Sequence, residues 1–383
     1  MFWVIFDTST KRDYYRDVHN LLALPPGSTI RYDYNERHLS AAAIAEAGKA
    51  GASATKVLVA YAQDKNFKKG GADPVGPITY PQGLWIGTRI ANLSHLRFSV
   101  NRYYFDLELL DYPAGNPGAF DRIMQALAAA QETPFAKWVT ASDLDSEFDL
   151  LSGGTTSANW ASTIDRLGTF PTQFAGDSFW RVAKIARSWP KSNVTPLLND
   201  HTEIIGGQEI TTGVDAVYPI YELDKLSVQI ESRIPEAGEE SRDKEPATAR
   251  SVTFATAPDG LLKDINGKTL ILRRYATDWI EAEVAGTDRV DTQHCDVTLT
   301  TGPVVPDAFP IGPELRLRFQ VTKRPGTGYF AILFAIAGGA CLAGAGFLKD
   351  QIEWAILLGV VGVLLFGVAG FLWTGRIRLP GGK

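Results

Sequence analysis

Residues 344–360 read GAGFLKDQIEWAILLGV, and within this stretch a short polar segment at 349–353 separates two long apolar runs. The runs cover 328–348 and 354–373, and neither contains Asp, Glu, Lys or Arg. Because a helix of about 20 apolar residues crosses a hydrocarbon core of about 30 Å, each run is long enough to span a membrane. The polar segment has room only for a tight turn. The sequence therefore predicts a transmembrane helical hairpin over 328–373.

The charges beside the hairpin predict its orientation. Lys and Arg flank its outer ends, whereas the turn carries Lys349 beside Asp350 and Glu353. Because Lys and Arg concentrate on the cytoplasmic side, we expect both termini to face the cytoplasm of an inner (plasma) membrane, with 374–383 as a basic cytoplasmic tail. Aromatic rings near the run ends favour the membrane interface. The interfacial residues expected from these patterns are Arg316, Arg318, Lys323, Arg324, Tyr329, Trp354, Trp373, Arg376 and Arg378.

Small residues inside the two runs predict close helix packing. In the first run alanine or glycine recurs every four residues from Ala331, and in the second run four glycines lie toward one side. Such faces let helix backbones approach closely, either within one hairpin or between copies in a homo-oligomer. Neither run contains an ionisable residue, which argues against a proton relay or a transporter site. The residues expected at helix contacts are Ala335, Gly339, Ala343, Gly359, Gly362, Gly367 and Gly370.

The overall composition describes the rest of the chain. Of its 383 residues 45% are hydrophobic and 21% are charged, near the average for globular proteins, so large cores can form. The net charge of −5 argues against a general nucleic-acid binder. The expected partners are therefore the lipid bilayer, further copies of the chain and another protein. Cys295 lies in a strand pattern and Cys341 inside the first apolar run, so we expect no disulfide and a reducing compartment.

Changes in residue pattern divide the chain before the hairpin into three parts. Strand and helix patterns alternate over 1–115, which predicts a mixed α/β cytoplasmic domain. Helical patterns over 116–202, including DSFWRVAKIARSW at 177–189, predict a helical or irregular connector or insertion. Short alternating strands over 203–325 predict an all-β sandwich, which resembles immunoglobulin-like modules in architecture. Within it the polar segment 235–250 predicts an exposed loop.

The expected fold class is thus an α+β multidomain membrane protein. In chain order it has an N-terminal mixed α/β domain, a helical connector, an all-β sandwich and a C-terminal transmembrane helical hairpin. The last strand of the sandwich runs almost directly into the first apolar run, with only RPGTG between them. We therefore expect the sandwich to lie close to the bilayer.

Motifs for enzyme chemistry fail on their spacing. The acidic stretch from Asp143 to Glu147 lacks the glycine and the glutamate that a calcium loop needs at its sixth and twelfth positions. GKAGASATK at 48–56 does not match a P-loop, and its SATK lacks the companion motif of serine acyl-transfer enzymes. The five histidines do not pair at the spacing of metal ligands. We therefore expect no cofactor, and no catalytic or metal-binding residue is assigned.

Three functions remain open. The first is a non-enzymatic sensor and effector, in which the cytoplasmic domains bind a partner or ligand and the hairpin oligomerises and perturbs the membrane. Bacterial stress and antiphage effectors share this organisation of a soluble sensor with two membrane helices. The second is a passive membrane-tethered scaffold subunit of a larger complex. The third is a membrane-tethered enzyme whose site lies in the N-terminal α/β domain.

Overall fold

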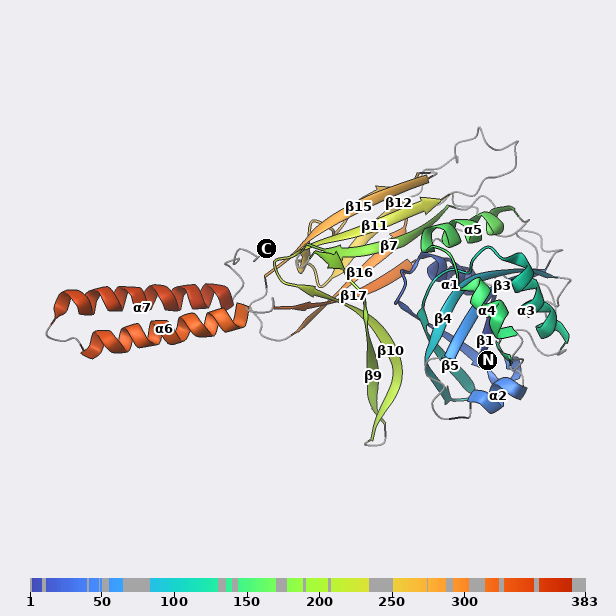
Figure 1. Ribbon diagram of the computed structural model, residues 1–383, viewed down its shortest axis with the longest axis horizontal. Helices are drawn as coiled ribbons and strands as arrows, with labels where there is room; N and C mark the ends of the chain where they lie inside the picture. The colour runs from blue at the N-terminus through green and yellow to red at the C-terminus, as the bar shows by residue number, and fades with distance from the viewer. Residues whose placement is uncertain are drawn as a thin grey trace.

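The computed structural model describes residues 2–8, 12–39, 41–47, 49, 55–64, 83–129, 136–139, 144–169, 178–188, 191–205, 208–233, 251–273, 275–286, 292–302, 314–323, 327–347 and 351–373. Within these ranges the protein has a mixed α/β architecture with three β-sheets and seven α-helices. Figure 1 shows two neighbouring domains built on the sheets, and a pair of long helices that projects away from them.

The N-terminal domain is built on a six-stranded sheet in the order β2-β5-β4-β3-β1-β6. Its strands are β1 (Phe2–Thr8), β2 (Thr29–Asn35), β3 (Thr55–Asp64), β4 (Gly83–Ser99), β5 (Arg102–Leu109) and β6 (Ala136–Val139). β1 and β3 pair in parallel, and the other neighbours pair antiparallel. Within the alternating strand and helix patterns of 1–115, the stretches FWVIF and KVLVAYAQ lie in β1 and β3. They are apolar without alternation because both of their faces are buried.

Five helices pack around this sheet. They are α1 (Arg12–Ala23), α2 (Ala41–Ala47), α3 (Pro117–Ala129), α4 (Asp145–Leu151) and α5 (Thr156–Thr169). Phe120 of α3 and Phe148 of α4 are buried against Phe2 and Val4 on one face of β1. Trp3 belongs to a second buried cluster, which includes residues of α1 and α2, because successive side chains of a strand point to opposite faces.

The second domain is a β-sandwich, as the alternating strands of 203–325 predict. Its sheets have the orders β14-β12-β16-β17-β10-β9 and β13-β15-β11-β7-β8. Their strands are β7 (Phe179–Arg187), β8 (Ser192–Asn193), β9 (Leu197–Ile205), β10 (Gln208–Tyr221), β11 (Lys225–Arg233), β12 (Ser251–Ala257), β13 (Leu262–Lys263), β14 (Thr269–Ile271), β15 (Tyr275–Val284), β16 (Gln293–Thr301) and β17 (Glu314–Thr322). Alternate residues of β11 and β17 are buried and fill the space between the sheets.

The segment 116–202, expected to be a connector, contributes strands to both domains. β6 pairs with β1 at the edge of the N-terminal sheet, and β7 pairs with β11 in the sandwich. The prediction of a helix over 177–189 is therefore wrong. Phe179, Trp180, Val182 and Ile185 recur at spacings that fit a helix face, but all four are buried in a strand. Pairing with a neighbouring strand overrides the weak local preference. The polar loop expected at 235–250 lies outside the described residues.

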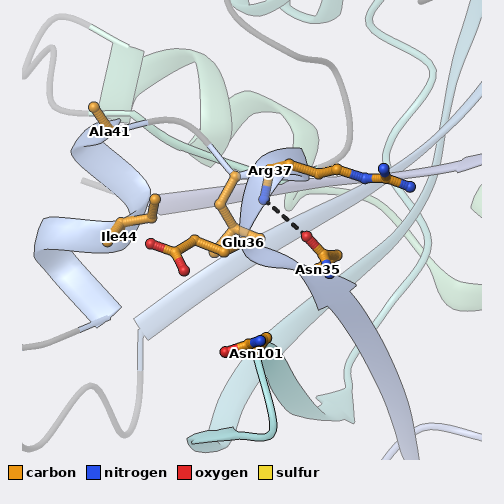
Figure 2. A pocket seen from close by; sticks show the side chains of 7 residues that line it. Asn35, Glu36, Arg37, Ala41, Ile44 and Asn101 are labelled. Carbon is orange, nitrogen blue, oxygen red and sulfur yellow. Dashed lines mark hydrogen bonds between the residues drawn. The ribbon is translucent and has the colours of Figure 1, made fainter.

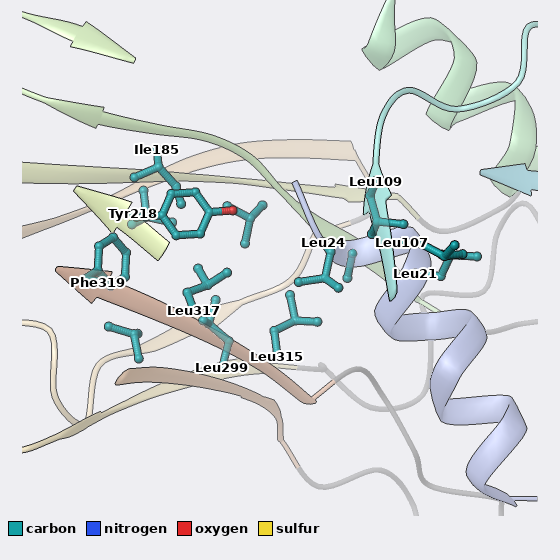
Figure 3. Packing of buried hydrophobic residues seen from close by; sticks show 14 of the residues in the cluster. Leu21, Leu24, Leu107, Leu109, Ile185, Tyr218, Leu299, Leu315, Leu317 and Phe319 are labelled. Atoms are coloured by element: carbon teal, nitrogen blue, oxygen red, sulfur yellow. The ribbon is translucent and has the colours of Figure 1, made fainter. Parts of the chain in front are cut away.

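A continuous apolar core joins the N-terminal domain to the sandwich (Figure 3). Leu21 of α1 and Leu107 and Leu109 of β5 belong to the same buried cluster as Leu315 and Leu317 of β17. We call this contact the domain junction, and we call the two joined domains the body. Because the junction removes leucine side chains of both domains from water, it stabilises their contact.

A half-buried ion pair holds β10 at the domain junction. Arg31 of β2 donates from Nη2 to Asp106 Oδ2 at 2.9 Å and to the carbonyl of Thr212 at 3.2 Å. The Asp106 side chain is 2% exposed and also accepts the backbone N–H of Val214 at 3.2 Å. A Cβ added to Gly213 would lie 1.8 Å from Nη2 of Arg31, so this close approach requires glycine.

The last two helices of the chain are α6 (Thr327–Phe347) and α7 (Ile352–Trp373). The helical structure expected for both apolar runs is thus confirmed. The two helices lie side by side and project away from the body in Figure 1. We refer to them together as the hairpin.

Candidate functional site

The hairpin is held together by small residues. Among its described side chains only Ala331, Gly338, Gly362 and Ala369 are buried, and they lie seven residues apart within each helix. A Cβ added to Gly338 would lie 2.9 Å from the carbonyl oxygen of Gly362, so the two backbones nearly touch. The heptad spacing is typical of helices that pack along a continuous seam. Gly338 lies outside the four-residue repeat used for prediction, and the seven-residue spacing is the signal that would have identified it.

The small residues expected at helix contacts occupy different environments. Gly362 lies in the seam, where an added Cβ would be 2.7 Å from Cγ of Leu342. Gly339 and Ala335 are half-buried beside it, and Ala343 is exposed. The second helix turns its remaining glycines away from the seam. Apart from the chain neighbours and the local helix backbone, no described atom lies within 4 Å of a Cβ added to Gly359, Gly367 or Gly370.

Large apolar side chains cover the outside of the hairpin. Ile336 of α6 is 68% exposed, and Leu364 of α7 is 64% exposed. Only 11% of an 18-residue window of α7 is buried, and the segment Ile352–Phe371 is long and apolar enough to cross a membrane. The described apolar part of α6, Phe330–Ala345, is shorter. A core helix of a soluble protein of this composition would be buried on all sides. By length and composition, α7 is therefore a candidate membrane span.

Two of the cations expected at the membrane interface lie on strand β17 of the sandwich and pair with carboxylates there. Arg316 of β17 pairs with Asp296 of β16. Arg318 donates from Nε to the same carboxylate at 3.0 Å and from Nη1 to Asp215 at 3.2 Å. Burial by itself would raise the pKa of Asp296, but hydrogen bonds from both arginines outweigh that effect and lower it. These two arginines therefore balance the carboxylates of neighbouring strands.

The other expected interfacial residues lie nearer to the hairpin. Lys323 follows β17, and its Nζ is 3.9 Å from Oε2 of the buried Glu222. Trp354 lies in the first turn of α7, with 58% of its surface exposed. Arg324, Arg376 and Arg378 lie outside the described residues, as do the side chains of Tyr329 and Trp373.

An open depression of about 680 Å³ lies on the N-terminal domain beside the short 3-10 helix η1 (Glu36–His38) and α2 (Figure 2). The Asn35 side chain accepts the backbone N–H of Arg37 at 3.2 Å, which caps η1. These polar groups thus serve the local backbone. The residues that line the depression are Asn35, Glu36, Arg37, Leu39, Ala41, Ile44 and Asn101.

The arrangement of the described His, Cys, Asp and Glu residues shows whether they could bind a metal ion. Among them, no group of three His, Cys, Asp or Glu side chains is placed to hold a metal ion. The acidic stretch compared with a calcium loop folds as helix α4 from Asp145 onward.

No protein-family model matches the chain, and no curated protein is significantly similar to it. The function proposed below follows from the burial, charge and packing of the described residues.

Proposed function

We propose that the protein is a membrane-anchored cytoplasmic sensor and effector. The body binds a partner or ligand, and the hairpin inserts into the plasma membrane, assembles between copies and perturbs the bilayer. The observation that carries this proposal is the burial pattern of the hairpin, where small residues are inside and large apolar residues are outside. In water such a surface would be strongly unfavourable, whereas lipid tails solvate it well.

Insertion of both helices is favoured by their backbone structure. A helix satisfies its own N–H and C=O groups, as the hydrocarbon core requires. The turn between α6 and α7 is short, so both helices would insert together and return the chain to the same side. The orientation with cytoplasmic termini rests on Lys323, Arg324 and the cations of the tail, because Arg316 and Arg318 pair with carboxylates of neighbouring strands.

Assembly between copies is favoured by the second glycine face of α7. Gly362 is used within the hairpin, but Gly367 and Gly370 point away from α6 and are exposed. In a membrane, small residues let a neighbouring helix approach closely, and dispersion and weak Cα–H contacts then hold the two helices. We therefore assign Gly362 to packing within one hairpin and Gly367 to packing between hairpins.

The connection between body and hairpin supports transfer of a signal. β17 contributes Leu315 and Leu317 to the domain junction, and the same strand leads into α6 after residues 323–326. A change in the fit between the N-terminal domain and the sandwich would therefore displace the strand that positions the hairpin. This continuity distinguishes a coupled effector from an anchor on a long flexible linker.

Membrane potential and dye entry in bacteria test the proposal. We expect the full chain to depolarise cells and a chain truncated after Lys323 to leave them intact. Gly367→Leu should remove the leak while the chain stays in the membrane fraction, because only contact between copies is lost. Val360→Leu, a conservative change at a side chain that is 53% exposed, is the matched control and should retain the leak. A full chain that is membrane-bound but harmless at high expression would contradict the effector function.

A passive scaffold is the second candidate, and the β9–β10 ribbon favours it. β9 is an edge strand of its sheet, and Figure 1 shows the ribbon extending away from the body. Ile204 near its tip is 80% exposed. Exposed strand edges can accept a strand from another protein. If an unrelated two-helix anchor replaces 327–373 without loss of function, the hairpin serves only as a tether and the scaffold is the correct assignment.

A further inference from the structure

Two arginines are buried where the N-terminal domain meets the sandwich. Arg89 of β4 is 0% exposed and Arg181 of β7 is 2% exposed. Their guanidinium carbons lie 3.9 Å and 5.5 Å from the ring centroid of Tyr112. Arg181 also lies 5.1 Å from the ring centroid of Trp160 in α5. We call these four residues the arginine cluster.

The two arginines differ in their partners. Arg181 donates from Nε and Nη2 to Oε2 of Glu231, at 2.9 and 2.7 Å, and from Nη2 to Ser157 at 2.8 Å. Arg89 donates from Nη1 to the carbonyl of Leu21 at 3.2 Å. Among the described residues, Nε and Nη2 of Arg89 and Nη1 of Arg181 have no hydrogen-bond partner. Such buried donors are rare in native proteins, because removing them from water without a partner is costly.

The unpartnered edge of Arg89 has a defined chemistry. Nε–H and Nη2–H of a guanidinium point the same way and match the two oxygens of a carboxylate or phosphate. The same edge of Arg31 holds Asp106, and that of Arg233 holds Asp165. At Arg89 the nearby carboxylate of Asp111 is already engaged, since it accepts the backbone N–H of Tyr112 and the hydroxyl of Thr156.

The electrostatic environment of Arg89 also favours an anion beside this edge. Burial is the main cause that lowers the pKa of Arg89. Tyr112, through its charge and a side-chain hydrogen bond, raises it in part, Arg181 lowers it further, and Asp111 raises it by the least. The carbonyls at the end of α1 and the ring face of Tyr112 offset part of this penalty. An anion bound beside the two guanidinium groups would offset much more of it, because opposite charges interact strongly in a buried environment.

We propose that the Nε and Nη2 edge of Arg89 binds a small oxyanion, a carboxylate or phosphate group, with Arg181 supplying the second positive charge. Arg89 belongs to the N-terminal domain and Arg181 to the sandwich, so the ligand reinforces the contact between them. In naming a ligand class for the sensing body, this inference rests on the proposed function. Its test does not, because binding is measured without any membrane leak.

Thermal unfolding of the full chain in detergent, followed by tryptophan fluorescence, tests the site. The protein is titrated with inorganic phosphate, with acetate and with sodium chloride at matched ionic strength. We expect a saturable rise in Tm of about 5 °C with phosphate or acetate beyond the effect of chloride. A response to phosphate alone assigns a phosphoryl ligand, and a response to acetate alone assigns a carboxylate. If neither exceeds chloride, the proposal is overturned.

Three variants separate ligand binding from a structural role. Arg89→Met should abolish the anion response without lowering Tm in anion-free buffer, because it removes a buried charge that lacks a carboxylate partner. Arg89→Lys keeps the charge but loses the paired donors, so its apparent affinity should fall at least about tenfold. Arg233→Met is the matched control: it breaks the pair with Asp165, and should lower Tm but retain the anion response. An anion response in Arg89→Met equal to that of the wild type would contradict the proposal.

Discussion

The body and the hairpin bury opposite kinds of residue. In the body the largest buried side chains include Trp3, Trp180 and Tyr61. Among the described residues of the hairpin, those that are buried are alanine and glycine, and most of the phenylalanines, leucines and valines are exposed. Water drives large apolar groups inward, so the body follows the usual rule for globular proteins. Lipid gives them no such drive, and close contact between small residues then decides how helices pack.

The contrast shows how to interpret an exposed apolar side chain. Leu364 of the hairpin and Ile204 of the β9–β10 ribbon are both exposed, at 64% and 80%. Exposure alone therefore does not distinguish them. Their surroundings do, because Leu364 lies on a helix covered with apolar side chains, whereas Ile204 follows the acidic residues Asp200 and Glu203. The first should contact lipid and the second water.

A charge placed at each position would test this contrast, with the largest effect we expect. Leu364→Arg should reduce the membrane-bound fraction, because Arg at the centre of a membrane helix costs about 3 kcal/mol. Ile204→Arg should leave both membrane binding and Tm within error, because a water-exposed substitution changes little. Fractionation of cells expressing each variant measures the difference. Equal membrane binding of both variants would mean that α7 does not cross the bilayer.

Glycine permits different close contacts in the hairpin and in the body. A glycine-to-alanine substitution, which adds one methyl group, should disrupt such a contact. In the hairpin Gly338 and Gly362 bring two backbones together, whereas in the body Gly213 admits the guanidinium of Arg31. Gly213→Ala should displace Arg31 from Asp106 and lower stability by about 1 to 3 kcal/mol. Gly153→Ala is the control, because the nearest atom to its added Cβ is 3.9 Å away. Thermal unfolding of the full chain in detergent measures both changes, and equal Tm values for the two variants would refute the close approach.

Alkaline pH should act on the body alone, and this is the smallest effect that we predict. Burial raises the pKa of Tyr218 to about 12, while its hydroxyl is 2.8 Å from Ser28 Oγ across the domain junction. Burial likewise raises the pKa of Cys295 to about 11. Because the folded state keeps both groups neutral when the unfolded chain ionises, their contributions are complete below about pH 9 and are lost as pH rises toward 12.

Tyr218→Phe isolates the tyrosine from this alkaline loss. The variant has no phenol to ionise, so between pH 10 and pH 11.5 its Tm should fall by about 2 to 4 °C less than that of the wild type. At pH 8 its Tm should be slightly lower than that of the wild type, because the contact with Ser28 is missing. Parallel alkaline losses in the two proteins would show that Tyr218 remains accessible to water.

Periodicity in the sequence predicted much of the secondary structure. Alternation over KLSVQIESRI and ELRLRFQVTK gave β11 and β17 because each strand has one face against the other sheet. The apolar runs at 328–348 and 354–373 gave α6 and α7, because an uninterrupted run of that length fits a helix better than a strand. The helix expected over 177–189 failed, because its apolar spacing fits both a helix and a strand and only pairing with β11 decides between them.

The candidate sites depended more on tertiary structure. Charge counting could not show that Arg316 and Arg318 pair with Asp296, because Asp296 lies on a neighbouring strand and is distant in sequence. Arg89 is recognisable in the sequence as a single cation inside the buried stretch WIGTRIA, but its neighbour Arg181 comes from the other domain. Sequence spacing cannot show which charges meet across such a contact.

The sequence by itself determined which segments are apolar and how they repeat, and this established the sandwich strands and the two long helices. Those properties are local, because they follow from side-chain transfer energies and from the periods of helix and strand. Only the tertiary structure decided that Gly338 meets Gly362, that Arg31 reaches Gly213 and that Arg89 lies near Arg181. These contacts depend on helix rotation, strand register and domain docking, which are set by the packing of the whole chain.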